Sequence, residues 1–590
     1  MSDLTDESHP EGPYDRLSQT PRSKLSNTEL SRFIDFIEKL EEETEHSLSL
    51  SHGYREMRMM LHLMRNHLAG RLTTPTSLAD ASGLSYGTAK RGIESIIARG
   101  LILSRPRTKS GKTVSLHPSP MMIDEWEAYA HRIKGLLGPL FGVDPVSETG
   151  RRIFLDAAAT DHVISPPAVL SARLELKGGL RGLIHADPTF MAMHNLKQQL
   201  ESIFGLEIHN SARSIDDLLK AILANAGRAT SRYDLVACDL PWFGELASKG
   251  ILQPLDRFMR RDAYDLSDFH PVAVQSTRYA GQQYGIPLQT TPELLCYRKD
   301  IFEQAQLEPP TTTEELVKVA RRLHDPARGR YGIAWNAARG TPLGHTFSFL
   351  MAKFGQPIIN LRRREGGYDF QQAVGEELRP MFQSDAAYRA CEYMLDILKY
   401  SPPHILNMAW YERAQSYASG EACMAYNYTL LAPLFELNKD SPAWGNTGYL
   451  PHPVGNHGRP ITPIGGYALA IPANLAEERV ESVWTALRHL TSANMSKLYI
   501  LNGSLVTPRF SVSQDPEVSA LSPLIEVVDD MARKDILQAW PRPPVPGITD
   551  VISIAGNEIF EVLDGRRSIK KALSMAQDRA DRVMRDRGYY

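Results

Sequence analysis

Apolar side chains recur at helical spacing through the N-terminal 140 residues. The spacing predicts three amphipathic helices, over residues 27–45, 54–69 and 122–137. The first and third have apolar faces that suit either a dimer interface or packing onto their own domain, and the pattern leaves both open. Residues 1–26 are polar, contain Pro and Gly and have no such period, so we expect a disordered tail there.

Two shorter helices are predicted between residues 77 and 100. Gly83 permits the tight turn between them, and Ser85 is a good N-cap for the second helix. That helix buries one face, made of Ala89, Ile93, Ile96 and Ile97. After Gly100, two short apolar stretches flank a basic loop, which predicts a β-hairpin, or wing.

The pattern changes after a stretch rich in Gly and Pro. Residues 139–180 predict a linker with some ordered structure. From residue 181 onward, strand, helix, strand, helix and strand alternate as far as Trp242, which predicts a parallel sheet. Ligands of such sheets bind beyond the carboxyl ends of the strands, where we expect His185, Asp187, Asp239 and Trp242 to lie.

Composition narrows the class of protein. The 590 residues are 42% hydrophobic and 23% charged, as in globular proteins, and the net charge is −3. The four Cys form no CxxC pair, so neither a disulfide framework, a metal site nor a cofactor is indicated. The N-terminus lacks the apolar region of a signal peptide, and no apolar run reaches the ~18 residues of a membrane span. We therefore expect a cytoplasmic protein.

Charge is concentrated in the segment that carries the two short helices and the wing. Residues 71–119 contain eight Lys or Arg against Asp80 and Glu94, a local charge of +6. Such charge suits DNA phosphates, and the second helix would enter the major groove by its first turn. The residues expected to contact DNA are Ser85, Tyr86, Thr88, Lys90, Arg91, Arg105, Arg107, Lys109 and Lys112.

The segment LADASGLSYGTAKRGIESIIARGLI and the wing resemble the winged helix-turn-helix of MarR-type transcription regulators. The resemblance covers residues 54–119 and implies a homodimer on a double-stranded DNA operator. A winged domain that contacts protein instead of DNA is the alternative.

The C-terminal 400 residues resemble the family 1 extracellular solute-binding proteins, the maltose-binding-like group of the type II periplasmic-binding-protein fold. The resemblance rests on ordered blocks that include YDLVACDLPWFGELASKGILQPLD, YASGEACMAYNYT and GGYALAIPANLAEERVESVWTALRHLTS. It implies two α/β lobes with a small molecule between them. The residues it places in the cleft are His185, Asp187, Asp239, Trp242, Gln289, Thr290, Trp335, Asn336, Asn427, Tyr428, Gly465, Gly466, Tyr467 and Arg509.

Aromatic rings with carboxylate and amide groups suit a sugar, whose CH faces stack and whose hydroxyls need hydrogen-bond partners. A polyamine, phosphonate or metal chelate is the alternative ligand. No catalytic motif occurs, and Asp187, Asp239 and Glu293 are expected to bind hydroxyls, so no enzyme activity is predicted. The run LRRREGG at Leu361 predicts a solvated hairpin loop in preference to an anion site.

The sequence thus predicts a multidomain chain. A tail at 1–26 precedes a helical, winged DNA-binding domain with flanking helices at 27–138, a linker at 139–180 and a two-lobed α/β ligand sensor at 181–590. The predicted function is a ligand-responsive transcription regulator.

Overall fold

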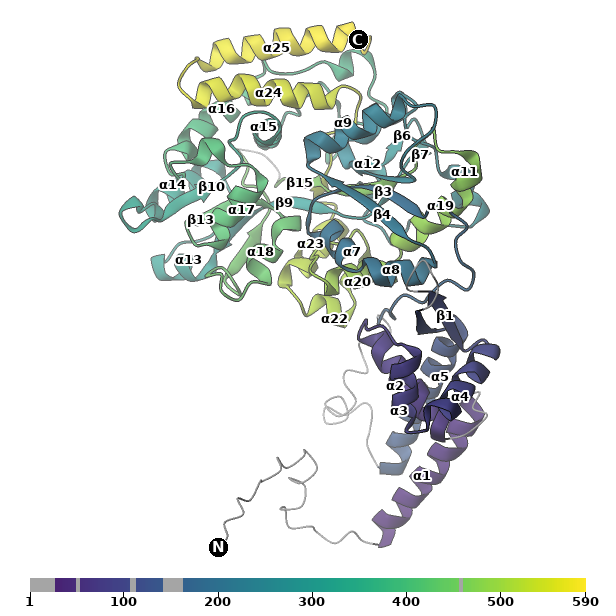
Figure 1. Ribbon diagram of the computed structural model, residues 1–590. Coiled ribbons are helices and arrows are strands. Elements are labelled where there is room, and N and C mark those ends of the chain that lie inside the picture. The colour runs from purple at the N-terminus through teal and green to yellow at the C-terminus, as the bar shows by residue number, and fades with distance from the viewer. Residues whose placement is uncertain (1–26, 49–53, 107–112, 142–162, 456–459) are drawn as a thin grey trace, which may run out of the picture. The chain divides into compact units, whose positions relative to one another are not determined.

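The computed structural model describes residues 27–48, 54–106, 113–141, 163–455 and 460–590 (Figure 1). Two compact units divide the chain. One holds most of the N-terminal helices, and the other holds residues 159–590 together with the short segments 65–74 and 103–117. No helix among the described residues is long and apolar enough to span a bilayer.

The N-terminal region contains the predicted helices and hairpin. The elements are α1 (Asn27–Ser47), α2 (Tyr54–Leu68), α3 (Pro75–Ser82), α4 (Tyr86–Ala98), β1 (Ile102–Pro106), β2 (Val114–Pro118) and α5 (Pro120–Phe141). The turn between α3 and α4 has Gly83 at φ +70°, a left-handed conformation that glycine adopts without strain. Ala89, Ile93 and Ile96 of α4 are buried as predicted, whereas Ile97 is half-buried.

Helix α1 packs along α5, and the hydroxyls of Thr44 and Tyr129 lie 2.7 Å apart between them. Phe33, Ile34 and Ile37 of α1 remain exposed, by 52%, 57% and 43%. Helix α1 therefore packs within its own module and still presents an apolar stripe that the other described residues leave exposed.

The first lobe is built on a five-stranded sheet in the order β4-β3-β5-β16-β8. Its strands are β3 (Leu180–His185), β4 (Ile208–Arg213), β5 (Leu235–Asp239), β8 (Ile286–Pro287) and β16 (Tyr467–Ala470). Strands β3, β4 and β5 are parallel, which confirms the predicted alternation, and β16 runs antiparallel to β5. The helices of this part of the chain are α7 (Pro188–Asn195), α8 (Lys197–Phe204), α9 (Ile215–Ala226), α10 (Phe243–Ser248), α11 (Asp256–Arg261), α12 (Pro271–Ser276), α19 (Glu477–Leu490), α20 (Ala493–Leu501), α21 (Phe510–Ser513), α22 (Pro516–Ser519) and α23 (Pro523–Arg533).

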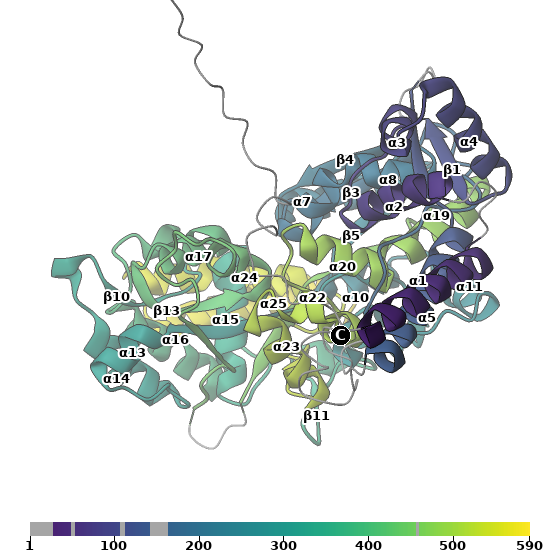
Figure 2. The same ribbon diagram turned by 90° about the horizontal axis from the view of Figure 1, so that it is seen from below.

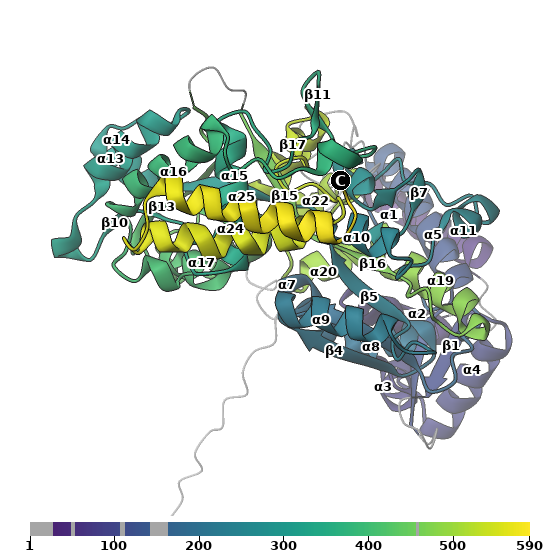
Figure 3. The ribbon, with the colours of Figure 1, turned by 90° about the horizontal axis from the view of Figure 1, so that it is seen from above.

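The second lobe has a mixed sheet in the order β10-β13-β9-β15-β17, with β14 also paired to β9. Its strands are β9 (Thr291–Arg298), β10 (Tyr331–Ala334), β13 (Ala422–Tyr428), β14 (Thr447–Leu450), β15 (Thr462–Gly465) and β17 (Leu537–Gln538). Its helices include α13 (Lys299–Ala305), α14 (Thr313–Leu323), α15 (Thr341–Lys353), α16 (Asp385–Leu398), α17 (Trp410–Ala418), α18 (Pro433–Glu436), α24 (Ile548–Leu563) and α25 (Ile569–Asp586). Helices α24 and α25 lie side by side, with α15 against α24 (Figures 1 and 3). Figure 2 shows α13, α14 and α16 gathered around β10 and β13.

The chain passes between the two sheets at residues 288–290, between β8 and β9, and at Gly466, between β15 and β16. These crossing segments touch. A Cβ at Gly466 would lie 2.7 Å from the carbonyl oxygen of Gln289, and the residue has φ +123°. Both the close approach and the backbone angle require glycine at this point.

Part of the segment predicted as a linker belongs to the first lobe. Residues 163–179 pack onto the first lobe, where Val169 and Leu176 are buried and the backbone of Leu170 bonds the carbonyl of Ile203. This segment forms part of the lobe because burying its apolar side chains stabilises the folded chain. Its Gly and Pro content, on which the linker was predicted, did not indicate that burial.

Candidate ligand-binding cleft

A cavity of about 680 Å³ lies between the two lobes. One wall comes from the carboxyl ends of β3 and β5 and the start of α7 and α9, and the other from the starts of β9 and α17, the end of β13, and α15 and α18. The volume lies within the range of about 300–1,000 Å³ that small-molecule sites occupy. The cleft therefore lies where the parallel-sheet rule predicts a ligand.

A buried ion pair joins the two walls. Nη1 and Nη2 of Arg542 lie 2.5 and 3.2 Å from the two carboxylate oxygens of Asp239, and both residues are more than nine-tenths buried. Burial alone would lower the pKa of Arg542, but the adjacent carboxylate raises it above its usual value. Asp239 is thus neutralised by a partner from the far end of the chain.

Asp187 is held by three donors in the first lobe. It accepts hydrogen bonds from the amide of Gln289, at 3.0 and 3.1 Å, and from the backbone N–H of Phe190, and it lies 3.1 Å from Nδ1 of His185. His185 in turn stacks on Tyr467, with ring centroids 4.5 Å apart. One face of Tyr467 is therefore covered by His185, so that face cannot receive a sugar ring as the sequence suggested.

Four cleft residues carry buried polar atoms that have no hydrogen-bond partner among the residues that the structure describes: the hydroxyls of Thr291 and Tyr428, Nδ1 of His345 and Nε of Arg542. Burial and neighbouring guanidinium groups hold the pKa of His345 well below its usual value, so its ring is neutral. Buried polar atoms in folded proteins are nearly always paired, and an unpaired one calls for a ligand, ion or water. These atoms are placed to donate to and accept from a ligand with hydroxyl groups.

Seven of the predicted ligand residues line the cleft: His185, Asp187, Asp239, Tyr428, Gly465, Gly466 and Tyr467. The other seven do not line it: Trp242, Gln289, Thr290, Trp335, Asn336, Asn427 and Arg509.

The excluded residues have structural positions that the sequence could not indicate. Trp242 is buried edge-on to Tyr467, and the amide of Gln289 donates a hydrogen bond to the carboxylate of Asp187. Asn427 precedes Tyr428 in β13, and successive residues of a strand point to opposite faces. Arg509 donates to the carboxylate of Asp268, 2.7 Å away, and covers the ring of Phe269.

The remaining excluded residues are buried as well. Trp335 donates its indole N–H to the hydroxyl of Ser401, and Asn336 and Thr290 are fully buried. Glu293, considered above with the carboxylates, lies in β9 and bonds Nη1 of Arg413 at 2.6 Å.

Sequence reasoning missed several of the residues that the second lobe contributes, although it included Tyr428 and Gly465. Thr291, His345 and Arg542 reach the cleft from elements that are distant in the sequence, and no local signal marks them. The adjacent aromatic residues Trp410 and Tyr411, at the start of α17, were a usable signal because paired rings at a helix start suit stacking.

The predicted DNA-contacting residues fall into three groups. Ser85, Tyr86, Thr88, Lys90 and Arg91 are exposed at or near the start of α4, as predicted. Arg105 is buried in β1 and donates to the carbonyl oxygen of Leu170, so it is not free for phosphate. Arg107, Lys109 and Lys112 lie outside the described residues.

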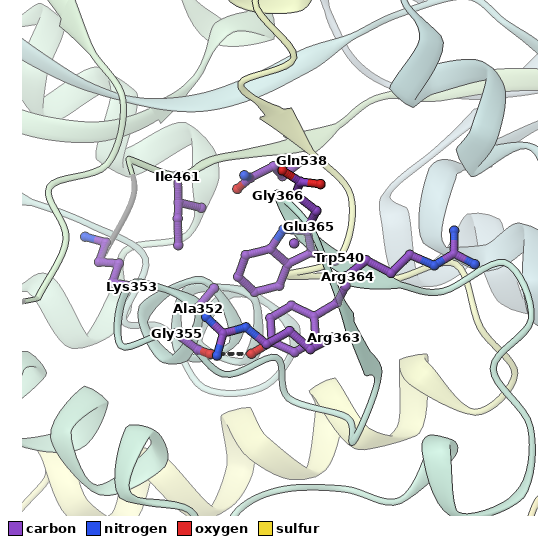
Figure 4. Close-up of a pocket in the computed structure, with 12 residues that line it drawn as sticks. Ala352, Lys353, Gly355, Arg363, Arg364, Glu365, Gly366, Ile461, Gln538 and Trp540 are labelled. Atoms are coloured by element: carbon purple, nitrogen blue, oxygen red, sulfur yellow. Dashed lines mark hydrogen bonds between the residues drawn. The ribbon is translucent and has the colours of Figure 1, made fainter. Parts of the chain in front are cut away.

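A second cavity, of about 410 Å³, lies beside the hairpin of β11 (Arg362–Arg364) and β12 (Gly367–Asp369) (Figure 4). The hairpin confirms the prediction for the LRRREGG run, and its three arginines are exposed. Arg362 and Arg364 both pair with Asp369, which neutralises part of the charge.

The fold has two lobes with a cavity of small-molecule size between them. No group of three or more His, Cys, Asp or Glu side chains among the described residues is arranged to hold a metal ion. Residues 210–494 match the bacterial extracellular solute-binding protein family. The C-terminal part of the chain therefore contains a domain of this family, while residues 27–141 lie outside the matched range.

Individual relatives agree with this assignment. The chain is 35% identical over 150 residues to the maltotriose-binding protein of Pyrococcus abyssi, a match that covers 25% of this chain but only 30% of that protein. It is 24% identical over 382 residues to the mannitol-binding protein of Pseudomonas aeruginosa, covering 61% and 82% of the two chains.

Solved structures show the same fold. A ribitol complex of an ABC transporter solute-binding protein from Agrobacterium radiobacter has a TM-score of 0.62 and 26% identity, covering 68% of this chain and 98% of that one. A mannitol-bound protein from Agrobacterium vitis has a TM-score of 0.60 and 18% identity, covering 70% and 99%.

Proposed function

We propose that the C-terminal module binds a carbohydrate or polyol in the cleft between its lobes. The observation that carries the proposal is the set of unpartnered buried polar atoms on Thr291, His345, Tyr428 and Arg542. Hydroxyl groups both donate and accept, so a polyhydroxylated ligand can pair with all of them. The ligands in the names of the relatives, maltotriose, mannitol and ribitol, support the same class.

A screen by thermal shift tests this proposal. Ribitol, mannitol, maltose and maltotriose are compared with spermidine, methylphosphonate and ferric citrate, which represent the alternative ligand classes. A ligand at 100 times its Kd stabilises the folded state by about 2.7 kcal/mol. Stabilisation by a sugar or polyol supports the proposal. Stabilisation by one of the other three compounds alone would overturn it.

A second function is proposed for the N-terminal module: binding to double-stranded DNA through α4 and the hairpin. The observation that favours it is the exposure of Tyr86, Thr88, Lys90 and Arg91 near the start of the helix after the Gly83 turn. The segment 71–119 has a charge of +6, which attracts phosphates. A MarR-type regulator would use the same surfaces, and DNA binding would place the protein in the cytoplasm. The alternative is that this module contacts protein.

DNA binding is measured by fluorescence anisotropy on a random duplex at several salt concentrations. Each phosphate contact contributes about 0.9 to the slope of log K against log salt. We expect the double variant Lys90→Ala/Arg91→Ala to lower that slope by up to about 2. Lys39→Ala, which removes the same kind of charge from an exposed position on α1, serves as the control and leaves the slope unchanged. An unchanged slope in the double variant favours the protein-contact alternative.

A homodimer is part of this second function. Phe33, Ile34 and Ile37 form an exposed apolar stripe on α1, which a second copy would cover. Sedimentation should show a dimer that the variant Ile34→Glu/Ile37→Glu converts to a monomer. If the wild type sediments as a monomer at all concentrations, the stripe has another role.

Coupling between the two functions would make the chain a ligand-responsive regulator. Ligand then changes DNA affinity, and DNA changes ligand affinity by the same factor, typically about 5–150-fold. Titrating DNA with and without the ligand found in the screen measures this factor. Equal affinities with ligand bound would mean that the cleft does not control DNA binding.

A further inference from the structure

The cleft has a polar floor and an apolar rim. Its buried members include the polar residues Asp239, Thr291, Tyr428 and Arg542. Among the members that are wholly or partly exposed, His185, Ser214 and Glu412 are polar. Most of the others are large and apolar: Pro188, Met191, Ile215, Trp410, Tyr411, Leu430, Pro433 and Leu434. We call this second set the rim.

The rim comes from both lobes. Met191 of α7, 45% exposed, and Ile215 of α9 lie on the first lobe. Leu430 and Leu434 lie on the second lobe, in the segment from 429 to 436 that follows β13. Helix α7 also approaches that segment directly. A ligand that reaches out from the floor therefore meets aliphatic side chains on two sides.

This rim does not match a free sugar or polyol. Every hydroxyl of such a ligand needs a hydrogen-bond partner when it leaves water, and aliphatic side chains provide none. Trp410 and Tyr411 can stack on a sugar, but Met191, Leu430 and Leu434 gain only from covering apolar atoms. The floor and the rim thus favour different chemistry within one cavity.

We propose that the ligand is a glycoside, with a hydroxyl-rich part on the floor and an aromatic or alkyl aglycone against the rim. This inference rests on the proposed carbohydrate binding and adds the class of ligand. The cavity, about 680 Å³, lies in the upper half of the usual range and has room for a ring beyond the sugar.

A rival explanation is that the two sides of the rim meet each other when the lobes close. In that case the apolar side chains stabilise the closed state with any ligand, whether or not it carries an aglycone. The two explanations differ in one measurable quantity, which is the ratio of affinities for two ligands that differ only in the aglycone.

Calorimetry on the full chain measures this ratio with pairs of methyl and phenyl glycosides of glucose, galactose, mannose and xylose, in both anomeric forms. We expect the phenyl glycoside of at least one sugar to bind at least tenfold more tightly than its methyl counterpart. Met191→Gln and Leu430→Asn should each reduce that ratio to near one, by weakening the binding of the phenyl glycoside more than that of the methyl glycoside. Leu437→Asn is the matched control, because Leu437 is 40% exposed just after α18 and does not line the cleft.

Each outcome decides between the explanations. Equal affinities for methyl and phenyl glycosides overturn the inference and leave carbohydrate binding intact. Equal loss of affinity for both ligands in Met191→Gln and Leu430→Asn, with the ratio preserved, assigns the rim to lobe closure and also overturns it. If neither glycosides nor the free sugars and polyols of the screen bind, the proposed function itself fails.

Discussion

Replacing Tyr428 with Phe tests whether the cleft is built to receive hydroxyl groups. The side chain lies at the end of β13, is 4% exposed, and its hydroxyl has no partner among the described residues. Burying a polar group without a hydrogen bond costs about 1–3 kcal/mol. Removing this hydroxyl should therefore raise the free energy of unfolding of the empty protein by about 1–3 kcal/mol.

Tyr426→Phe is the matched control, two residues earlier on the same strand. Its hydroxyl accepts a hydrogen bond from Nζ of Lys353 at 2.5 Å and lies 2.9 Å from the hydroxyl of Tyr393. Burial holds the pKa of Lys353 well below its usual value. Loss of two hydrogen bonds of ordinary strength should lower the free energy of unfolding by about 1–3 kcal/mol. The same chemical change thus has opposite signs at neighbouring positions of one strand.

Urea unfolding followed by tryptophan fluorescence measures both effects, and calorimetry with the ligand from the screen measures binding. Tyr428→Phe should weaken binding by about 5–150-fold, the equivalent of about 1–3 kcal/mol, because a ligand hydroxyl loses its partner. If Tyr428→Phe destabilises the empty protein as much as Tyr426→Phe does, the hydroxyl is not free and the reasoning fails. If binding is unchanged, Tyr428 does not contact the ligand.

Three further predictions concern other parts of the chain. Burial lowers the pKa of His270 from 6.5 to about 3. Between these two pH values, His270 binds a proton in the unfolded chain but stays neutral in the folded one. This contribution to the free energy of unfolding is present above pH 6.5 and is lost as the pH falls toward 3. The loss between pH 7 and 5 is about 2 kcal/mol. In urea unfolding, the variant His270→Leu should lack this part of the pH dependence. Arg542→Met leaves the carboxylate of Asp239 buried without a counter-charge and should lower the free energy of unfolding by about 3–5 kcal/mol. Adding Asp239→Asn should restore most of that loss. If it restores none, the broken ion pair is not the cause of the loss. Arg107→Ala/Lys109→Ala should flatten the salt dependence of DNA binding, and an unchanged slope would remove the wing from the DNA interface.

The sequence by itself determined the local elements and part of one wall of the cleft. Helical spacing marked the elements around Gly83, and the alternation of strands and helices from residue 180 to Trp242 marked the parallel part of the first sheet. His185, Asp187 and Asp239 were predictable because the carboxyl ends of parallel strands meet at one edge, whatever lies elsewhere in the chain.

The tertiary structure alone decided which residues complete the site. Arg542 reaches Asp239 across 303 positions of sequence, and Thr291 and His345 arrive from two other elements of the second lobe. It also decided that Tyr428 faces the cleft while Asn427 does not, and that His185 covers a face of Tyr467. Periodicity reports which positions share a face of one element, because it depends on backbone geometry over a few residues. Which faces then meet depends on how distant elements pack and on where the chain crosses between the sheets, and no local pattern encodes that.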